Sequence, residues 1–246
     1  MFRRGAGLAI IFVLVAIAPP ARADFVQQGG KLAGNDSAGT SNQGQSVALS
    51  ADGNTALVGG QNDFSQGAAW VYVRSNGVWS QQGAKLAGTG ATFGGAHQGN
   101  SVALSADGNT AILGGYADDG GVGAAWVFTR TGTTWSQQGQ KLVGSNAVGA
   151  SWQGYSVALS ADGNTAIVGG YQDDAQNGAV WIFTRTAGVW SQQGPKLVAD
   201  DAVGPAQQGW SVALSADGDT ALVGGPNDGT FVGSTWVYTR NGAVWT

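Results

Sequence analysis

The aspartates are the residues of this sequence best suited to chemistry, since all 15 acidic residues are Asp. Converging carboxylates can bind a cation, or serve as the acid and base of a glycosidase. The candidate metal ligands lie in four corresponding loops, at Asp63, Asp118, Asp119, Asp173, Asp174 and Asp228. Because Asp also favours loops for purely local reasons, we favour a structural role for them. The neighbouring pairs leave a weak calcium site open as the alternative.

Other catalytic chemistry has few candidate residues. The chain has no cysteine, which excludes thiol chemistry, cysteine-zinc sites and disulfides. Its one histidine, His97, lies in a glycine-rich segment without the sequence of a nucleophile elbow. We therefore predict no catalytic residues, no cofactor and no enzymatic activity, with a hydrolase built on Asp pairs kept as an alternative.

A repeated segment positions all these residues. Its serines at 46, 101, 156 and 211 are 55 residues apart. The four copies read QSVALSADGNTALVGG from Gln45, NSVALSADGNTAILGG from Asn100, YSVALSADGNTAIVGG from Tyr155 and WSVALSADGDTALVGG from Trp210. Two further blocks recur, one around Trp70, Trp126, Trp181 and Trp236 and one that begins at Val78, Thr134 and Val189. We predict a repeat domain over 24–246, with repeats of roughly 25–78, 79–134, 135–189 and 190–246.

Each repeat contains four strand signals. In the first, Ser46 to Ser50 alternates, Asp52-Gly53 is a hairpin turn and Thr55 to Val58 returns. A third strand, Ala68 to Val73, is apolar on both faces, and a polar fourth spans Trp79 to Leu86. Such a unit can cover its two faces only by stacking on neighbours, so we predict an all-β fold of four-stranded antiparallel blades, a β-propeller.

The two ends of the chain carry complementary parts of one fourth strand. FVQQGGKL from Phe25 lacks the start of the shared block, and the terminal VWT lacks its end. If the two meet, the four repeats close a four-bladed ring. The alternatives are that the repeats are part of a larger propeller, or that two copies associate into a larger ring.

The blocks SVA, VGG and GAAWVF, which recur in register from Phe25 to Trp245, resemble the FG-GAP repeat. This is the blade of integrin α-subunit propellers and of many secreted bacterial proteins. The resemblance implies an adhesion or ligand-binding propeller, although integrin propellers have seven blades. It also implies a calcium loop at the first hairpin, but Ala48, Ser50 and Ala56 replace three of its oxygen ligands. We therefore interpret the Asp-Gly pairs as turns.

Residues that differ between the copies indicate a binding site better than those that repeat. Our candidates are Phe93, His97, Trp152, Tyr155 and Trp210, all before or at the start of a first strand. Their aromatic faces could stack on sugar rings if these linkers share a rim, whereas the alternative is ordinary packing between blades. The predicted partner is a protein or glycan bound at a propeller rim.

Basic residues also recur at fixed positions. Lysines lie in the fourth-strand block at Lys31, Lys85, Lys141 and Lys196, and arginines end the third strand at Arg74, Arg130, Arg185 and Arg240. They could contact carbohydrate or carboxylate groups, but lysines on an edge strand also prevent strand addition, and we favour that role.

The first 23 residues read as an export signal. Arg3 and Arg4 precede an apolar core from Leu8 to Ala18, and Ala21-Arg22-Ala23 is a small-x-small cleavage site. The core is shorter than the ~20 residues of a membrane-spanning helix. Removal of 1–23 leaves 8 basic residues against 15 acidic ones, which argues against nucleic acid as a partner. We predict a secreted, periplasmic or cell-surface protein without a membrane span.

Overall fold

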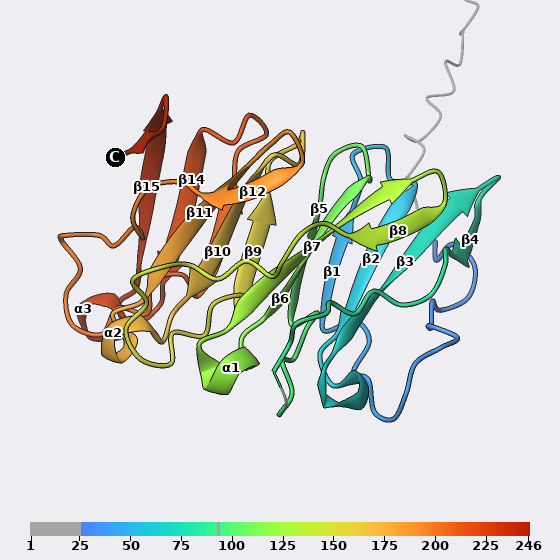
Figure 1. Cartoon of the computed structure of the whole chain (residues 1–246), viewed down its shortest axis with the longest axis horizontal. Helices are drawn as coiled ribbons and strands as arrows, with labels where there is room; N and C mark the ends of the chain where they lie inside the picture. Colours follow the sequence, from blue (N-terminus) through green and yellow to red (C-terminus); the bar gives the residue numbers. More distant parts are fainter. Residues whose placement is uncertain (1–25, 93) are drawn as a thin grey trace, which may run out of the picture.

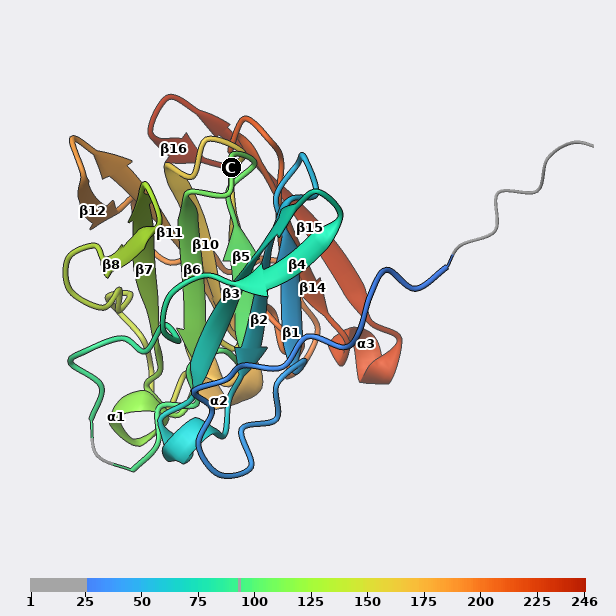
Figure 2. The same ribbon diagram turned by 90° about the vertical axis from the view of Figure 1, so that its right-hand side faces the viewer.

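A computed structural model describes residues 26–92 and 94–246 and shows an all-β chain (Figures 1 and 2). Its strands form four separate four-stranded sheets, each with its strands in sequence order and antiparallel. The predicted fold class is confirmed. Within these residues no helix is long and apolar enough to cross a membrane. The predicted export signal lies outside the described residues.

Each sheet is one blade, numbered here from the N-terminus. Blade 1 contains β1 (Ser46–Leu49), β2 (Thr55–Gly60), β3 (Ala68–Ser75) and β4 (Val78–Gln81). Blade 2 contains β5 (Ser101–Leu104), β6 (Thr110–Gly115), β7 (Ala124–Thr131) and β8 (Thr134–Gln137). Blade 3 contains β9 (Ser156–Leu159), β10 (Thr165–Gly170), β11 (Ala179–Thr186) and β12 (Val189–Gln192). Blade 4 contains β13 (Ser211–Leu214), β14 (Thr220–Gly225), β15 (Ser234–Asn241) and β16 (Val244–Trp245).

One short helical turn joins the second and third strands of every blade. These turns are η1 (Asp63–Ser65), α1 (Asp118–Gly121), α2 (Asp173–Gln176) and α3 (Asp228–Phe231). The three labelled turns lie at one end of the sheets, at the bottom of Figure 1. The linkers that lead into each first strand lie at the same end. Because these linkers carry residues that differ between the repeats, such side chains can come together there.

The Asp-Gly pairs form turns, as the sequence predicts. The Asp52 carboxylate accepts hydrogen bonds from the Ser50 hydroxyl, at 2.5 Å, and from the Asn54 backbone, at 2.9 Å. The Ser50 hydroxyl in turn accepts the Thr55 backbone N–H. The same contacts recur in the other three hairpins. These carboxylates are thus occupied in closing the turn between the first two strands.

Neighbouring blades bury one another's apolar faces. Leu57, Ala69 and Val71 of blade 1 pack in one cluster with Val102 and Trp126 of blade 2. Blade 2 packs on blade 3 through the corresponding residues, and blade 3 on blade 4. A fully buried tryptophan removes roughly 150–250 Å² from water, so each junction is stabilised mainly by apolar burial. The third-strand tryptophans Trp70, Trp126 and Trp181 are fully buried core residues, as predicted, whereas Trp236 of blade 4 is only partly buried.

A polar contact on the outer side reinforces each junction. Gln82, just after β4, accepts hydrogen bonds from Arg130, at 3.1 Å, and Trp135, at 3.1 Å, of blade 2. Gln138 and Gln193 make the same two bonds to the next blade. The recurring arginines therefore fix a glutamine of the preceding blade, and also stack over the fourth-strand tryptophans.

The four blades form an open arc. In the described part of the chain, the first strands of consecutive blades contact one another, and blades 1 and 4 lie at opposite ends of the arc (Figure 1). Among the described residues, the N-terminal segment contacts blade 1, where Gln28 accepts hydrogen bonds from Arg74 and Trp79. The described residues therefore do not form the closed ring of four blades (Figure 1), which was one of the three possibilities that the sequence left open.

The repeated lysines have a role that the sequence reasoning missed. Lys85, Lys141 and Lys196 form ion pairs with the buried Asp63, Asp118 and Asp173. The other carboxylate oxygen of each Asp accepts a backbone N–H of the linker that approaches the turn, from Ala38, Thr92 and Val148. The lysines thus neutralise buried carboxylates rather than protect an edge strand.

The predicted metal ligands do not converge. Within 26–92 and 94–246, no group of three or more His, Cys, Asp or Glu residues could hold a metal ion. Asp119 and Asp174 are exposed, and Asp228 binds the Val203 backbone and the Ser234 hydroxyl. Asp63, Asp118 and Asp173 already have both oxygens occupied. The geometry therefore favours the structural role of these aspartates.

Acid should destabilise the fold through the hairpin carboxylates. Hydrogen bonds from Ser50 and Asn54 lower the pKa of Asp52 from 3.8 to about 2. The Ser215 hydroxyl likewise lowers the pKa of Asp217. A lowered folded-state pKa means that unfolding takes up protons. The stability that these carboxylates contribute is therefore fully present above about pH 4 and is lost as the pH falls towards about 2. Urea midpoints measured from pH 5 to pH 2 should fall, and D52N should reduce that slope by about one proton. An unchanged slope in D52N would contradict this assignment.

Breaking one of the ion pairs should destabilise its blade. D118N leaves Lys141 without its counter-charge, and because that lysine is one-fifth exposed we expect a loss of about 2 kcal/mol, below the 3–5 of fully buried pairs. D119N, at the exposed neighbouring carboxylate, should change stability by less than about 0.5 kcal/mol. Chemical denaturation measures both. Equal effects of the two substitutions, or a rise in the midpoint on adding calcium to the unsubstituted protein, would indicate a metal site instead.

Candidate functional site

Six aromatic side chains form one continuous cluster beside the first strands of blades 2 to 4, which are β5, β9 and β13. Their rings belong to His97, Tyr116, Trp152, Tyr155, Tyr171 and Trp210. Each ring centroid lies 4.5–6.4 Å from that of at least one other member. We refer to these six residues as the aromatic cluster.

Two kinds of position supply the cluster. His97 and Trp152 come from the linkers before β5 and β9, while Tyr155 and Trp210 directly precede β9 and β13. Tyr116 and Tyr171 directly follow β6 and β10 and lead into the turns α1 and α2. The first two strands of a blade are antiparallel, so the start of one lies beside the end of the other, and all six side chains reach the same end of the sheets.

The cluster is built along a line that crosses two blade junctions. His97 stacks on Tyr116 at 5.3 Å with only 13° between the ring planes. Tyr116 then contacts Trp152 at 5.0 Å. At the other end, Tyr171 lies 4.5 Å from both Tyr155 and Trp210. Both edge-to-face and stacked geometries occur, which are the favourable arrangements of aromatic rings.

The cluster is open to solvent along part of its length. Tyr171 is buried beneath it, Trp210 is exposed, and the other four members are partly buried. Burial, with smaller contributions from Tyr171 and Tyr116, raises the pKa of the Tyr155 hydroxyl, which therefore stays protonated at neutral pH. The surface offers flat apolar faces with phenol and indole groups able to hydrogen bond at their edges.

The backbone that presents two of these rings is strained. His97 and Trp152 have positive φ angles of 57° and 58°. The corresponding residues of blades 1 and 4, Asn42 and Gln207, have the same conformation, which Asn adopts most readily. A bulky ring in this conformation costs about 1 kcal/mol or more, and such strain is often kept where a side chain must be presented to a ligand.

Four of the five predicted binding residues meet in the cluster. These are His97, Trp152, Tyr155 and Trp210; Phe93 lies outside the described residues. Sequence reasoning missed Tyr116 and Tyr171, although the signal was present, since Gln61 and Pro226 occupy their positions in the other two blades. The rule that the differing residues mark the site would have found them.

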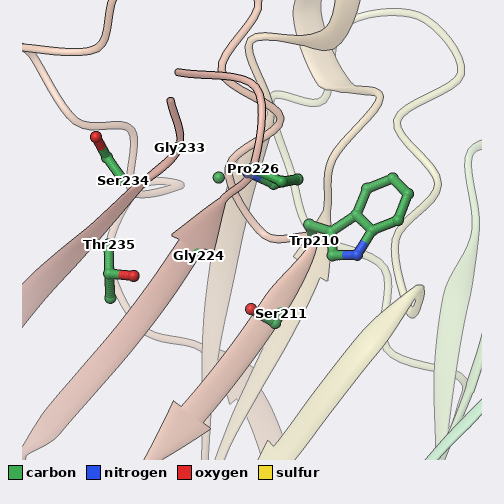
Figure 3. Close-up of a pocket in the computed structure, with 8 residues that line it drawn as sticks. Trp210, Ser211, Gly224, Pro226, Gly233, Ser234 and Thr235 are labelled. Carbon is green, nitrogen blue, oxygen red and sulfur yellow. The ribbon is translucent and has the colours of Figure 1, made fainter. Parts of the chain in front are cut away.

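A hollow of about 400 Å³ lies at the Trp210 end of the cluster, on blade 4 (Figure 3). It is lined by Trp210, Ser211, Gly224, Gly225, Pro226, Gly233, Ser234 and Thr235. Most of its lining is backbone and small side chains, with no ionisable group among them. It is therefore suited to receive another segment of backbone rather than a charged small molecule.

No protein-family model matches the sequence, and no curated protein matches it either. The FG-GAP resemblance therefore stays a prediction.

The structure resembles several solved ones. A protein assigned as a 6-phosphogluconolactonase from Bacteroides uniformis matches with a TM-score of 0.54 and 15% identity, over 82% of this chain and 52% of the other. Hydrazine synthase from Kuenenia stuttgartiensis matches with a TM-score of 0.51 and 15% identity, over 85% and 49%. A protein assigned as TolB from Agrobacterium tumefaciens gives 0.48 and 17%, over 81% and 59%. The chain thus spans about half the length of the first two structures, and its likeness to these two establishes only the fold, a propeller-type arrangement of blades.

Proposed function

We propose that this protein is a secreted, non-enzymatic propeller module that binds its ligand through the aromatic cluster, and that the ligand is a carbohydrate. The observation that carries the proposal is the convergence of six aromatic side chains from three blades on one end of the sheets. The surrounding repeats are nearly identical, so these positions are where the blades have diverged. An adhesion role follows if that carbohydrate lies on another cell, in keeping with the FG-GAP resemblance.

A carbohydrate suits this surface for a chemical reason. A sugar ring has an apolar C–H face that packs on an aromatic ring and hydroxyl groups around its edge that hydrogen bond. The partly exposed indoles of Trp152 and Trp210 supply such faces, and the protonated hydroxyl of Tyr155 supplies a polar edge group. No charged residue belongs to the cluster, so a neutral glycan fits better than a phosphorylated or nucleic acid ligand.

The arrangement around the sole histidine supports binding rather than catalysis. A hydrolytic site needs a base beside a nucleophile. The His97 ring instead stacks on Tyr116, and its Nδ1 atom is buried with no hydrogen-bond partner among the described residues. The likeness to a protein assigned as a lactonase is at 15% identity and concerns the fold alone.

The binding proposal is tested by substitution of the cluster tryptophans. We expect the protein to retain neutral oligosaccharides on a glycan array. W152A and W210A should each weaken binding at least tenfold in calorimetry, because each removes a stacking face worth about 1.4 kcal/mol or more. The matched control is F64A, which removes an exposed aromatic ring outside the cluster. Absence of glycan binding, or equal affinities for all four proteins, would refute the proposal.

Secretion is tested separately. We expect a bacterium that expresses the full sequence to export the protein, with a mature chain that begins at Asp24. N-terminal sequencing of the exported protein measures the cleavage point. Replacing Ala21 and Ala23 with bulky residues should leave the precursor uncleaved, whereas an intact N-terminus in the unsubstituted protein would contradict export by signal cleavage.

A further inference from the structure

The two end blades expose faces that the inner blades bury. We call the face that packs on the preceding blade the front face, and the one that packs on the following blade the rear face. On the front face, Val102 is 8% exposed in blade 2, but its counterpart Val47 in blade 1 is 69% exposed. On the rear face, Val71 of blade 1 is fully buried, whereas its counterpart Val237 in blade 4 is 60% exposed.

These two faces are the two halves of one junction. Leu57 and Val71 of blade 1 bury the front face of blade 2, and Leu222 and Val237 occupy their positions in blade 4. Leu222 is 44% exposed, compared with 0% for Leu57. The rear face of blade 4 is therefore shaped for the front face of a further blade, and blade 1 has the front face that lacks a partner.

Backbone hydrogen bonds between blades leave the same two ends open. The Ala51 N–H donates to the Ala106 carbonyl, Ala106 to Ala161, and Ala161 to Ala216, each at 2.9 Å. Across the described residues the series ends with the N–H of Ala216 unused in blade 4 and the carbonyl of Ala51 unused in blade 1. One more step of the same series would join Ala216 to Ala51.

The hollow on blade 4 corresponds to a place that the inner blades fill. In blade 3, Gly178 is bridged to Gln208 of the following linker, and the Gly209 carbonyl accepts the Ser156 hydroxyl at 2.7 Å. The corresponding residues on blade 4, Gly233 and Ser211, line the empty hollow (Figure 3). Gln43 and Gly44, in the linker before blade 1, occupy the positions that correspond to Gln208 and Gly209, and they are the residues that would fill the hollow.

Gln43 and Gly44 are in turn less buried than their counterparts. Gln98, Gln153 and Gln208 are at most 1% exposed, while Gln43 is partly exposed and Gly44 is exposed. A Cβ atom added to Gly99 or Gly154 would overlap a neighbouring blade, but one added to Gly44 would meet nothing. The linker of blade 1 thus lacks the contact with a preceding blade that the corresponding linkers of the other blades make.

The charges are complementary as well. Asp63, Asp118 and Asp173 each pair with the lysine that follows their own blade. Asp228 of blade 4 has no lysine partner in the described part of the chain, where it binds Ser234 instead. Lys31 lies in the matching block ahead of blade 1, is exposed, and makes no ion pair there. The junction would therefore bring one unpaired lysine to one unpaired aspartate.

We propose that the rear face of blade 4 binds the front face of blade 1 of a second copy of this chain, and that two copies close a ring of eight blades. A head-to-tail interface forms a closed ring when its rotation completes a turn, and two four-bladed arcs then make two identical junctions. Eight blades lie within the range of known propellers. The match of the chain to about half of larger solved structures agrees with a half ring.

The oligomeric state of the full chain tests this proposal. Light scattering after size exclusion should give twice the mass of one chain at micromolar concentration. V237D, which places a carboxylate in the apolar junction, should give the mass of one chain without loss of circular dichroism. V244D is the matched control: Val244 is 63% exposed on the same blade, and its counterparts Val78 and Val189 remain 68% exposed despite having neighbouring blades. V244D should therefore remain a dimer.

Charge reversal makes the test specific to the proposed pairing. K31D and D228K should each weaken dimerisation at least tenfold, because each opposes two like charges at the junction. An equimolar mixture of K31D and D228K should restore the dimer, since both junctions then pair a lysine with an aspartate. The double variant should also dimerise.

Other occupants of the faces would give different results. A monomer at all concentrations, with V237D unchanged, would overturn the proposal and leave the faces for another partner or for further repeats. A mass of three or more chains, or a filament, would overturn the closed ring of two. A dimer that survives V237D, or that the mixed charge variants fail to restore, would show that the copies meet elsewhere.

Discussion

The structure depends on one constraint: a four-stranded blade has two apolar faces and can bury them only against other blades. Val71 and Leu57 on one side, and Val102 and Trp126 on the other, are buried because a neighbour lies against them. The same residue types become exposed wherever the neighbour is missing, as at Val47 and Val237. Stability is therefore a property of junctions rather than of single repeats, as expected for repeat architectures.

Polar groups determine how the blades are aligned once apolar burial has brought them together. The alanine backbone bonds fix the inner side of each junction, and glutamines such as Gln82 fix the outer side through Arg130 and Trp135. Asp118 in addition holds the linker to the turn, through its ion pair with Lys141 and its hydrogen bond from Thr92. Because these groups are nearly identical in every repeat, each junction has the same geometry, and the line of blades curves regularly into an arc.

This regular frame leaves a small set of positions free to vary. Two of them carry Gln45 and Asn42 in blade 1. In the following blades the Gln45 position carries Asn, Tyr and Trp, and the Asn42 position carries His, Trp and Gln. The backbone at Trp152 has a positive φ angle, which holds the indole in a fixed orientation. The packing of the surrounding repeats offsets the free-energy cost of this strain. Binding chemistry can thus change without disturbing the junctions, which explains how a nearly uniform repeat protein can have a localised site.

The sequence by itself determined the blades, because local signals suffice for them: the 55-residue period, the Asp52-Gly53 turn, and a third strand apolar on both faces. It also predicted four members of the aromatic cluster from their differences between copies. Tertiary structure decided what those signals do not encode. It joined Tyr116 and Tyr171 to the cluster by placing strand ends beside strand starts, and it paired Lys141 with Asp118, 23 residues away. It also left the arc open, because closure depends on the angle between blades, which side-chain packing across each junction sets.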